Sequence, residues 1–198
     1  GALSGTTVAV TPTATTVYTV VGTTTLGCTA TKTVNLVVNP NPTVTAVSNP
    51  TAICAGQSAT LTGSGATSYT WNPGALSGAT VAVTPTTSTI YTVTGANGSC
   101  TNTKTVSITV NSNPTVTAVS SPTAICAGSS ATLTGSGAST YTWNPGALTG
   151  TTVAVTPTVT TTYTVIGTST VGCTNTKTIS LVVNSIPTVT ATSNPTII

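Results

Sequence analysis

Cysteines are the residues of this sequence best suited to chemistry. Cys28, Cys100 and Cys173 recur 72 and 73 residues apart, and Cys54 and Cys126 recur 72 apart. A structural zinc site needs closely spaced Cys or His ligands, and the sequence has no CxxC pair and no histidine. Free buried thiols are one alternative, because cysteine is often a core residue. We interpret the cysteines as disulfide-forming, which indicates an oxidising, extracytoplasmic compartment.

The predicted disulfide pairs are Cys54–Cys100 and Cys126–Cys173, because both members of each pair then lie between the same two linkers. Each bridge would close a loop of about 47 residues, worth about 4 kcal/mol on the chain-entropy model. Cys28 would pair with a cysteine outside this sequence. In an alternative phase, Cys28–Cys54 and Cys100–Cys126 would bridge neighbouring repeats and leave Cys173 unpaired.

Catalytic residues are largely missing. The 198 residues include no Asp, Glu or His, and the only charged side chains are three lysines. General acid–base catalysis and nucleophilic triads rely on those absent residue types, and hard cations such as calcium prefer carboxylates. We therefore expect no enzyme, no cofactor and no catalytic, cofactor-binding or metal site.

The net charge of +3 does not indicate a nucleic-acid partner, and no segment of the sequence is long and apolar enough to predict a membrane span. Three lysines spread along the whole chain cannot neutralise a track of phosphates. The longest apolar runs, such as residues 36–38, fall far short of the roughly 20 residues that span a bilayer. The N-terminus has no signal-peptide pattern. We therefore predict no nucleic-acid binding and no membrane span in this segment.

The aromatic residues have two possible roles. Trp71 and Trp143, with Tyr69 and Tyr141 beside them, would suit a sugar-stacking platform or a hydrophobic core. A tryptophan on a central strand is typical of the core of an immunoglobulin-like sandwich. The predicted core aromatics are Tyr69, Trp71, Tyr91, Tyr141, Trp143 and Tyr163.

Internal repetition is the strongest pattern in the chain. Residues 51–56 and 69–76 recur at 123–128 and 141–148, again 72 residues on. Gly1 aligns with Gly74, inside a repeat, so we expect a segment of a longer tandem array. The predicted domains are the C-terminal half of a truncated repeat (1–39), two complete repeats (40–111 and 112–184), and the first strand of a truncated next repeat (185–198).

Each repeat has the pattern of short β-strands. Apolar and polar residues alternate, as at Tyr69 and Trp71 or at Val81 and Val83, and the intervening positions are mostly Thr or Ser. Thr fills 56 of the 198 positions, which suits strands and keeps their outer face polar without charge. Turn residues separate the strands, and no helical periodicity is present. Six or seven such strands in about 70 residues predict an all-β fold, with tandem Ig-like β-sandwich repeats of about 72 residues.

Four segments also carry a family resemblance. Residues 53–62, 69–74, 89–93 and 99–105 are similar to PKD-like and Ig-like tandem repeats of very large type IX-secreted bacterial cell-surface proteins, a group that includes the giant gliding-motility adhesin. The resemblance implies a seven-stranded sandwich, outer-membrane attachment through another part of the chain, and a role in adhesion or gliding motility. PKD-like domains often carry acidic loop residues, and these copies have none.

These observations favour a non-enzymatic, extracellular structural stalk or filament segment of a bacterial cell-surface adhesin. One alternative is that the repeats themselves bind glycans or surfaces with avidity. Another is a subunit of a pilus-like polymer. The expected partners are neighbouring repeats of the same chain, with lateral self-association into fibres and binding to extracellular surfaces or glycans as further expectations.

Overall fold

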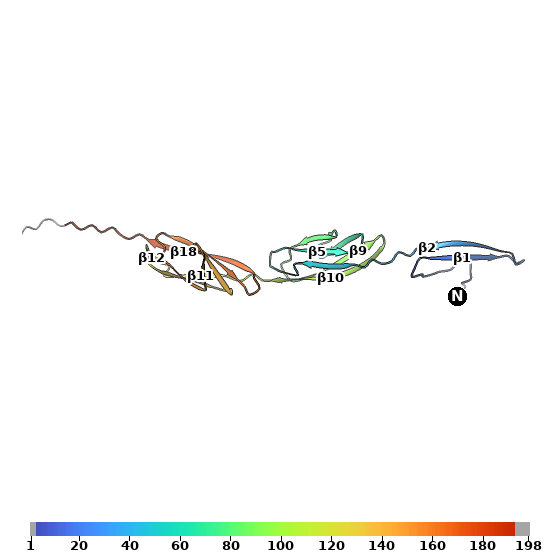
Figure 1. Cartoon of the computed structure of the whole chain (residues 1–198), viewed down its shortest axis with the longest axis horizontal. Helices are drawn as coiled ribbons and strands as arrows, with labels where there is room; N and C mark the ends of the chain where they lie inside the picture. The colour runs from blue at the N-terminus through green and yellow to red at the C-terminus, as the bar shows by residue number, and fades with distance from the viewer. Residues whose placement is uncertain (1–2, 193–198) are drawn as a thin grey trace, which may run out of the picture. The chain divides into compact units, whose positions relative to one another are not determined.

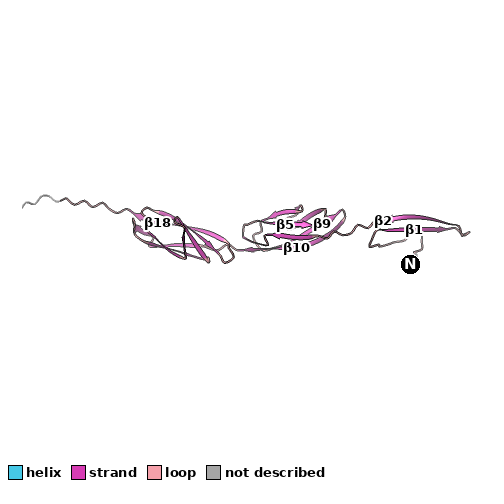
Figure 2. Ribbon diagram, viewed as in Figure 1, coloured by secondary structure: helices cyan, strands magenta, loops and turns pink. Residues whose placement is uncertain are grey.

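The computed structural model describes residues 3–192, and every regular element there is a β-strand (Figures 1 and 2). The chain divides into two compact units. The first holds residues 1–51, 58–83 and 89–108, and the second holds 52–57, 84–88 and 109–198. Residues 52–57, which the sequence repeat assigns to 40–111, thus belong to the second unit.

Both complete repeats are built of strands in which apolar and polar residues alternate. We call residues 40–111 the middle repeat and residues 112–184 the last repeat. The strands of the middle repeat are β3 (Thr45–Asn49), β4 (Ala52–Cys54), β5 (Ala59–Ser64), β6 (Ser68–Asn72), β7 (Leu76–Ser77), β8 (Thr80–Val83), β9 (Thr89–Asn97) and β10 (Cys100–Asn111). Those of the last repeat are β11 (Thr117–Ser121), β12 (Ala124–Cys126), β13 (Ala131–Ser136), β14 (Thr140–Asn144), β15 (Leu148–Thr149), β16 (Thr152–Val155), β17 (Thr161–Thr168) and β18 (Thr174–Asn184).

The last repeat is an Ig-like β-sandwich. Its three-stranded sheet has the order β11-β13-β16, and its five-stranded sheet has the order β12-β18-β17-β14-β15. Antiparallel pairing joins all neighbours except β12 and β18, which are parallel. The middle repeat has the same topology, with sheets β3-β5-β8 and β4-β10-β9-β6-β7. Each repeat therefore has eight described strands, one more than predicted; β7 and β15 are two-residue strands that the alternation did not reveal.

The core lies between the two sheets. Leu133 of the three-stranded sheet and Trp143 and Val165 of the five-stranded sheet are all 0% exposed and belong to one apolar cluster. Their counterparts in the middle repeat, Leu61, Trp71 and Val93, are equally buried. The period-two alternation thus buries one face of each strand and leaves the Thr-rich face in water.

In the partial repeat 1–39, the hairpin of β1 (Thr16–Thr23) and β2 (Thr29–Leu36) corresponds to the β9–β10 hairpin of the middle repeat. Val20, the counterpart of the fully buried Val93, is 60% exposed there. No second sheet covers this hairpin in the part of the chain that the structure describes. The contrast shows that burial in the complete repeats comes from the facing sheet.

Residues 185–198 were predicted to form the first strand of a further repeat. Positions 185–192 carry no strand, and 193–198 lie outside the described residues. The corresponding strands β3 and β11 pair with β5 and β13. Among the described residues, 185–192 have no such partner, and an isolated strand leaves its backbone groups unpaired.

Candidate functional site

The candidate site is the segment where one sequence repeat follows another, and Cys54 marks one side of it. The end of β10 runs parallel to β4, with Asn111 opposite Cys54 in the register. The N–H of Ala55 donates to the carbonyl of Asn111 at 2.9 Å, and the N–H of Gln57 donates to the carbonyl of Cys54 at 2.9 Å. These bonds hold Cys54 beside the residue that begins the linker into the last repeat.

Cys173 marks the other side, in the turn between β17 and β18. The N–H of Ser169 donates to the Cys173 carbonyl at 2.8 Å, and the Cys173 N–H donates to the Ser169 hydroxyl at 3.1 Å. Gly172 completes this turn with a φ of +84°, a conformation that glycine adopts readily. The turn therefore fixes the direction of the Cys173 side chain from both ends.

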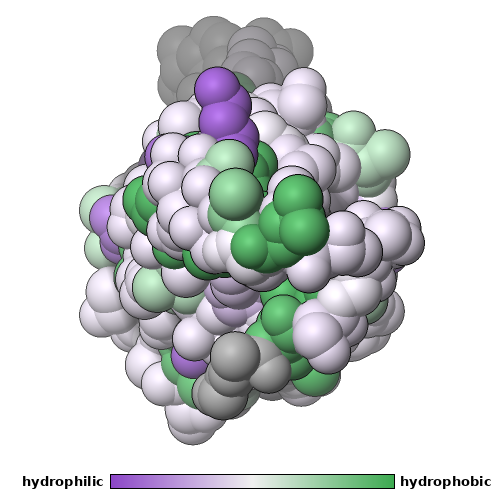
Figure 3. Space-filling model, turned by 90° about the vertical axis from the view of Figure 1, so that its right-hand side faces the viewer, coloured by the Kyte–Doolittle hydropathy of each residue, from purple (hydrophilic) through white to green (hydrophobic). Residues whose placement is uncertain are grey.

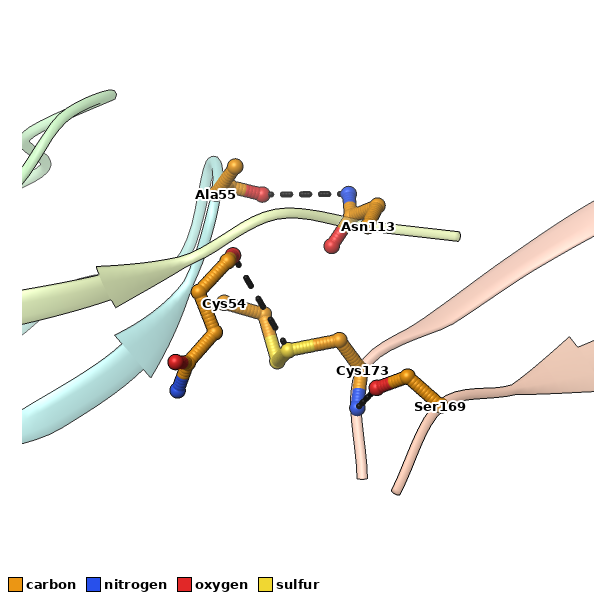
Figure 4. Close-up of a disulfide and its surroundings, with 6 residues drawn as sticks. Cys54, Ala55, Asn113, Ser169 and Cys173 are labelled. Carbon is orange, nitrogen blue, oxygen red and sulfur yellow. Dashed lines mark hydrogen bonds between the residues drawn. A yellow bond between two sulfur atoms is a disulfide. The ribbon is translucent and has the colours of Figure 1, made fainter. Parts of the chain in front are cut away.

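A disulfide joins Cys54 to Cys173 within the second compact unit (Figure 4). The two Cα atoms are 5.5 Å apart, and the sequence separation is 119 residues. Cys173 is fully buried. Beside the bridge, the Asn113 amide donates to the carbonyl of Ala55 at 3.3 Å. The bond thus links covalently two successive sequence repeats.

This bridge overturns the predicted pairs Cys54–Cys100 and Cys126–Cys173, which are wrong. In the last repeat, Cys126 pairs in register with Asn184, the final residue of β18, whereas Cys173 directly precedes that strand. A strand rises about 3.3 Å per residue, so an 11-residue strand separates these cysteines by on the order of 35 Å. A disulfide needs Cα atoms within about 7 Å.

The same geometry excludes the pair Cys54–Cys100. Cys100 is the first residue of β10, and Cys54 lies opposite its last residue, Asn111. The alternative phase, with Cys28–Cys54 and Cys100–Cys126, is contradicted as well, because Cys54 is bonded to Cys173. Cys28, Cys100 and Cys126 are free thiols, of which Cys28 and Cys126 are exposed. The pairing of Cys28 with a cysteine outside this sequence stays a prediction.

Asparagines hold the linkers next to the cysteine turns. In the last repeat, the Asn175 amide donates to the carbonyl of Pro114 at 3.0 Å. In the middle repeat, the Asn102 amide donates to the carbonyl of Pro42, also at 3.0 Å. Each asparagine oxygen accepts the N–H of the next residue, at 2.8 Å for Asn102 and 2.9 Å for Asn175, which fixes the orientation of the side chain. The start of each complete repeat is therefore tied to its own last hairpin.

The predicted aromatic residues are all in the cores. Tyr69, Trp71, Tyr91, Tyr141, Trp143 and Tyr163 are at most 9% exposed. The Trp71 indole donates to the carbonyl of Gly78 at 3.0 Å, and Trp143 makes the same bond to Gly150. Because both indoles are fully buried and hydrogen-bonded, they cannot form a sugar-stacking platform.

Two core tyrosines have raised pKa values. Burial raises the pKa of the Tyr91 phenol, and it raises the pKa of the Tyr163 phenol in the same way. Tyr163 also lines a shallow apolar depression with Pro145, Leu148 and Val155. Apart from the Tyr163 phenol, the residues around that depression have no titratable side chain.

No cluster of metal-ligating side chains occurs among residues 3–192. Within the same range, no helix is long and apolar enough to cross a membrane. The surface view in Figure 3 is dominated by residues of intermediate hydropathy, with few strongly hydrophilic side chains. This matches a sequence with 2% charged residues.

Neither a family model nor a curated protein matches the chain. Solved structures resemble it loosely. Murine CEACAM1b is 11% identical, with 72% of this chain and 100% of that one covered and a TM-score of 0.35. A Ca²⁺-stabilised adhesin of an Antarctic bacterium is 16% identical, with 87% of this chain and 57% of that one covered and a TM-score of 0.36. A 1.5-MDa bacterial ice-binding adhesin is 18% identical, with 85% of this chain and 74% of that one covered and a TM-score of 0.34. These likenesses are too distant to carry an argument about function.

Proposed function

We propose that this chain is a structural, load-bearing segment of the stalk of a bacterial cell-surface adhesin. The observation that carries the proposal is the disulfide Cys54–Cys173, which joins successive repeats of one sequence pattern. A stalk benefits from it, because tension along the chain passes through the bridge and bypasses the residues between the two cysteines.

Composition supports the same role. The absence of Asp, Glu and His removes the usual acids and bases of enzymes. Disulfides persist in oxidising compartments, which favours an extracellular position. Attachment to the outer membrane through another part of the protein, and a role in attachment or gliding motility, belong to this proposal.

The partners of the stalk are neighbouring repeats of the same chain. The Thr-rich outer faces carry almost no charge, so little electrostatic repulsion opposes lateral association of stalks into fibres. Binding of extracellular surfaces or glycans by the repeats would have to use these outer faces, since both tryptophans are buried.

Single-molecule pulling tests the load-bearing role directly. The chain is held at its two ends and stretched, first oxidised and then with a thiol reductant. The bridge spans 119 residues, so reduction should release on the order of 400 Å of additional extension, at about 3.5 Å per residue. Cys54→Ser should show the long extension without reductant. Equal extension before and after reduction would contradict the proposal.

The size and position of the native polypeptide test the stalk itself. On intact cells, an antibody against the repeats should label the surface. Under reducing, denaturing conditions, the polypeptide should be many times larger than the 19.2 kDa of this chain. A native species near 19.2 kDa would instead favour a pilus-like polymer of small subunits.

A further inference from the structure

We propose that a disulfide closes every boundary between repeats, and that Cys126 and Cys100 are the bonding positions of two further bridges. We call Cys54 and Cys126 the first-position cysteines, and Cys28, Cys100 and Cys173 the second-position cysteines. Each bridge joins the first-position cysteine of one repeat to the second-position cysteine of the next. This inference rests on the geometry of the cysteines and is independent of the proposed function.

Cys126 occupies the same local structure as the bonded Cys54. It pairs in register with Asn184, as Cys54 pairs with Asn111. The N–H of Ala127 donates to the Asn184 carbonyl at 2.9 Å, the distance found for the corresponding bond at Cys54. The Ser129 N–H donates to the Cys126 carbonyl at 3.0 Å, against 2.9 Å for the equivalent bond. The backbone that presents Cys54 to its partner is thus already formed around Cys126.

Cys100 lies where the last strand of its repeat begins, as the bonded Cys173 does, although the turns before these strands differ: residues 98–99 link β9 to β10, and residues 169–173 link β17 to β18. The Cys100 sulfur lies 3.4 Å from the carbonyl oxygen of Asn39, and the Cys173 sulfur lies 3.9 Å from that of Asn111. Asn39 and Asn111 are equivalent residues at the start of successive linkers. Of these two asparagines, Asn111 pairs in register with Cys54. A first-position cysteine paired with Asn39 in the same register would therefore lie beside the sulfur of Cys100.

The chemistry is ordinary thiol–disulfide exchange. Two cysteine thiols lose two protons and two electrons as the S–S bond forms, and a disulfide oxidant takes up the electrons and becomes two thiols. Cys126 is exposed, and Cys100 is partly exposed, so an oxidant can reach both. The partner sulfur belongs to an adjoining repeat, either of the same polypeptide or of a second copy.

The positions of the lysines allow trypsin digestion to distinguish the possible disulfide patterns. Trypsin cleaves after Lys32, Lys104 and Lys177, so residues 33–104 and 105–177 become separate peptides. Peptide 33–104 carries Cys54 and Cys100, and peptide 105–177 carries Cys126 and Cys173. Each peptide therefore holds one cysteine of each position, and the proposed bridges would connect peptides end to end.

The test is complete tryptic digestion of the native polypeptide, isolated without reductant, thiol-blocked with iodoacetamide and denatured. We expect peptides 33–104 and 105–177 only within larger covalent species that contain further cysteine peptides. Reduction should release them singly, with no alkylated Cys100 or Cys126 before reduction. A species of these two peptides alone, with Cys100 and Cys126 alkylated, would overturn the proposal. Single peptides with internal bridges would overturn it too.

Undigested protein identifies the source of the partner. If the denatured mass is the same with and without reductant, the bridges lie within one polypeptide. If reduction lowers the mass, the partner cysteine comes from a second copy. Either result supports the proposal, provided that Cys100 and Cys126 are oxidised.

Discussion

The thiol of Cys100 lies 3.4 Å from the carbonyl oxygen of Asn39 and has no sulfur partner within this chain. Cys28 and Cys126 are free as well, whereas Cys54 and Cys173 are bonded. In the 198-residue chain, oxidised and then denatured, iodoacetamide should therefore modify Cys28, Cys100 and Cys126. Mass spectrometry should detect Cys54 and Cys173 as modified only after reduction. Unmodified Cys100 in the unreduced monomer would contradict this pairing.

Loss of the bridge should destabilise the second compact unit. Cys54→Ser removes a link across 119 residues, and loss of a native disulfide costs about 2–5 kcal/mol. Cys100→Ser is the matched control, because that thiol makes one hydrogen bond, to Asn39, and its loss should cost about 1 kcal/mol or less. Urea unfolding followed by tryptophan fluorescence measures both. Equal large losses in the two variants would favour the pair Cys54–Cys100 instead.

Gly95 is a position where the core has no room for a methyl group. A Cβ there would lie 2.5 Å from Val44 Cγ2 and 2.8 Å from Ala66 Cβ, whereas at the equivalent Gly22 nothing lies within 4 Å. Gly95→Ala should therefore lower the free energy of unfolding by about 1–3 kcal/mol, the usual cost of overpacking. Gly22→Ala should leave it nearly unchanged. Chemical denaturation of the two variants compares them, and similar losses would contradict the packing of β9 against Val44.

Stability should be flat in acid and should fall in strong alkali. The sequence has no Asp, Glu or His, the side chains whose protonation usually drives acid unfolding. Burial raises the pKa of Tyr91 and Tyr163 above 10.0, so above that pH the unfolded chain releases phenolic protons that the folded chain keeps. The unfolded state then binds fewer protons, and stability declines as pH rises.

Urea midpoints between pH 3 and pH 11, on thiol-blocked protein, check this dependence. The midpoint should be constant up to about pH 9 and fall above pH 10. The double variant Tyr91→Phe, Tyr163→Phe should reduce the alkaline slope. An unchanged slope in that variant would assign the decline to other groups.

Alternation in the sequence was enough to predict the core. Trp71 and Trp143 were expected on inward-facing strand positions, and both are fully buried. The strand and turn pattern predicted the Ig-like sandwich, and the structure has that fold. These features are local, since a period of two decides which face of a strand is apolar.

The cysteine pairing could not be read from the same signal. It depends on the parallel register of β4 on β10, which places Cys54 opposite Asn111. Nothing in the alternation gives that register. One clue was present: the ten residues between Cys100 and Asn111 have a strand-like sequence, so Cys100 had to lie at the far end of the strand from the following linker.

The disulfide between successive repeats is tested most directly by a non-reducing tryptic map of the purified 198-residue chain after thiol blocking. We expect one disulfide-linked species of peptides 33–104 and 105–177, joined through Cys54 and Cys173 and separated by reduction. Recovery of the two peptides unlinked, each with an internal disulfide, would show that the bridges lie within single repeats and that Cys54 is not bonded to Cys173.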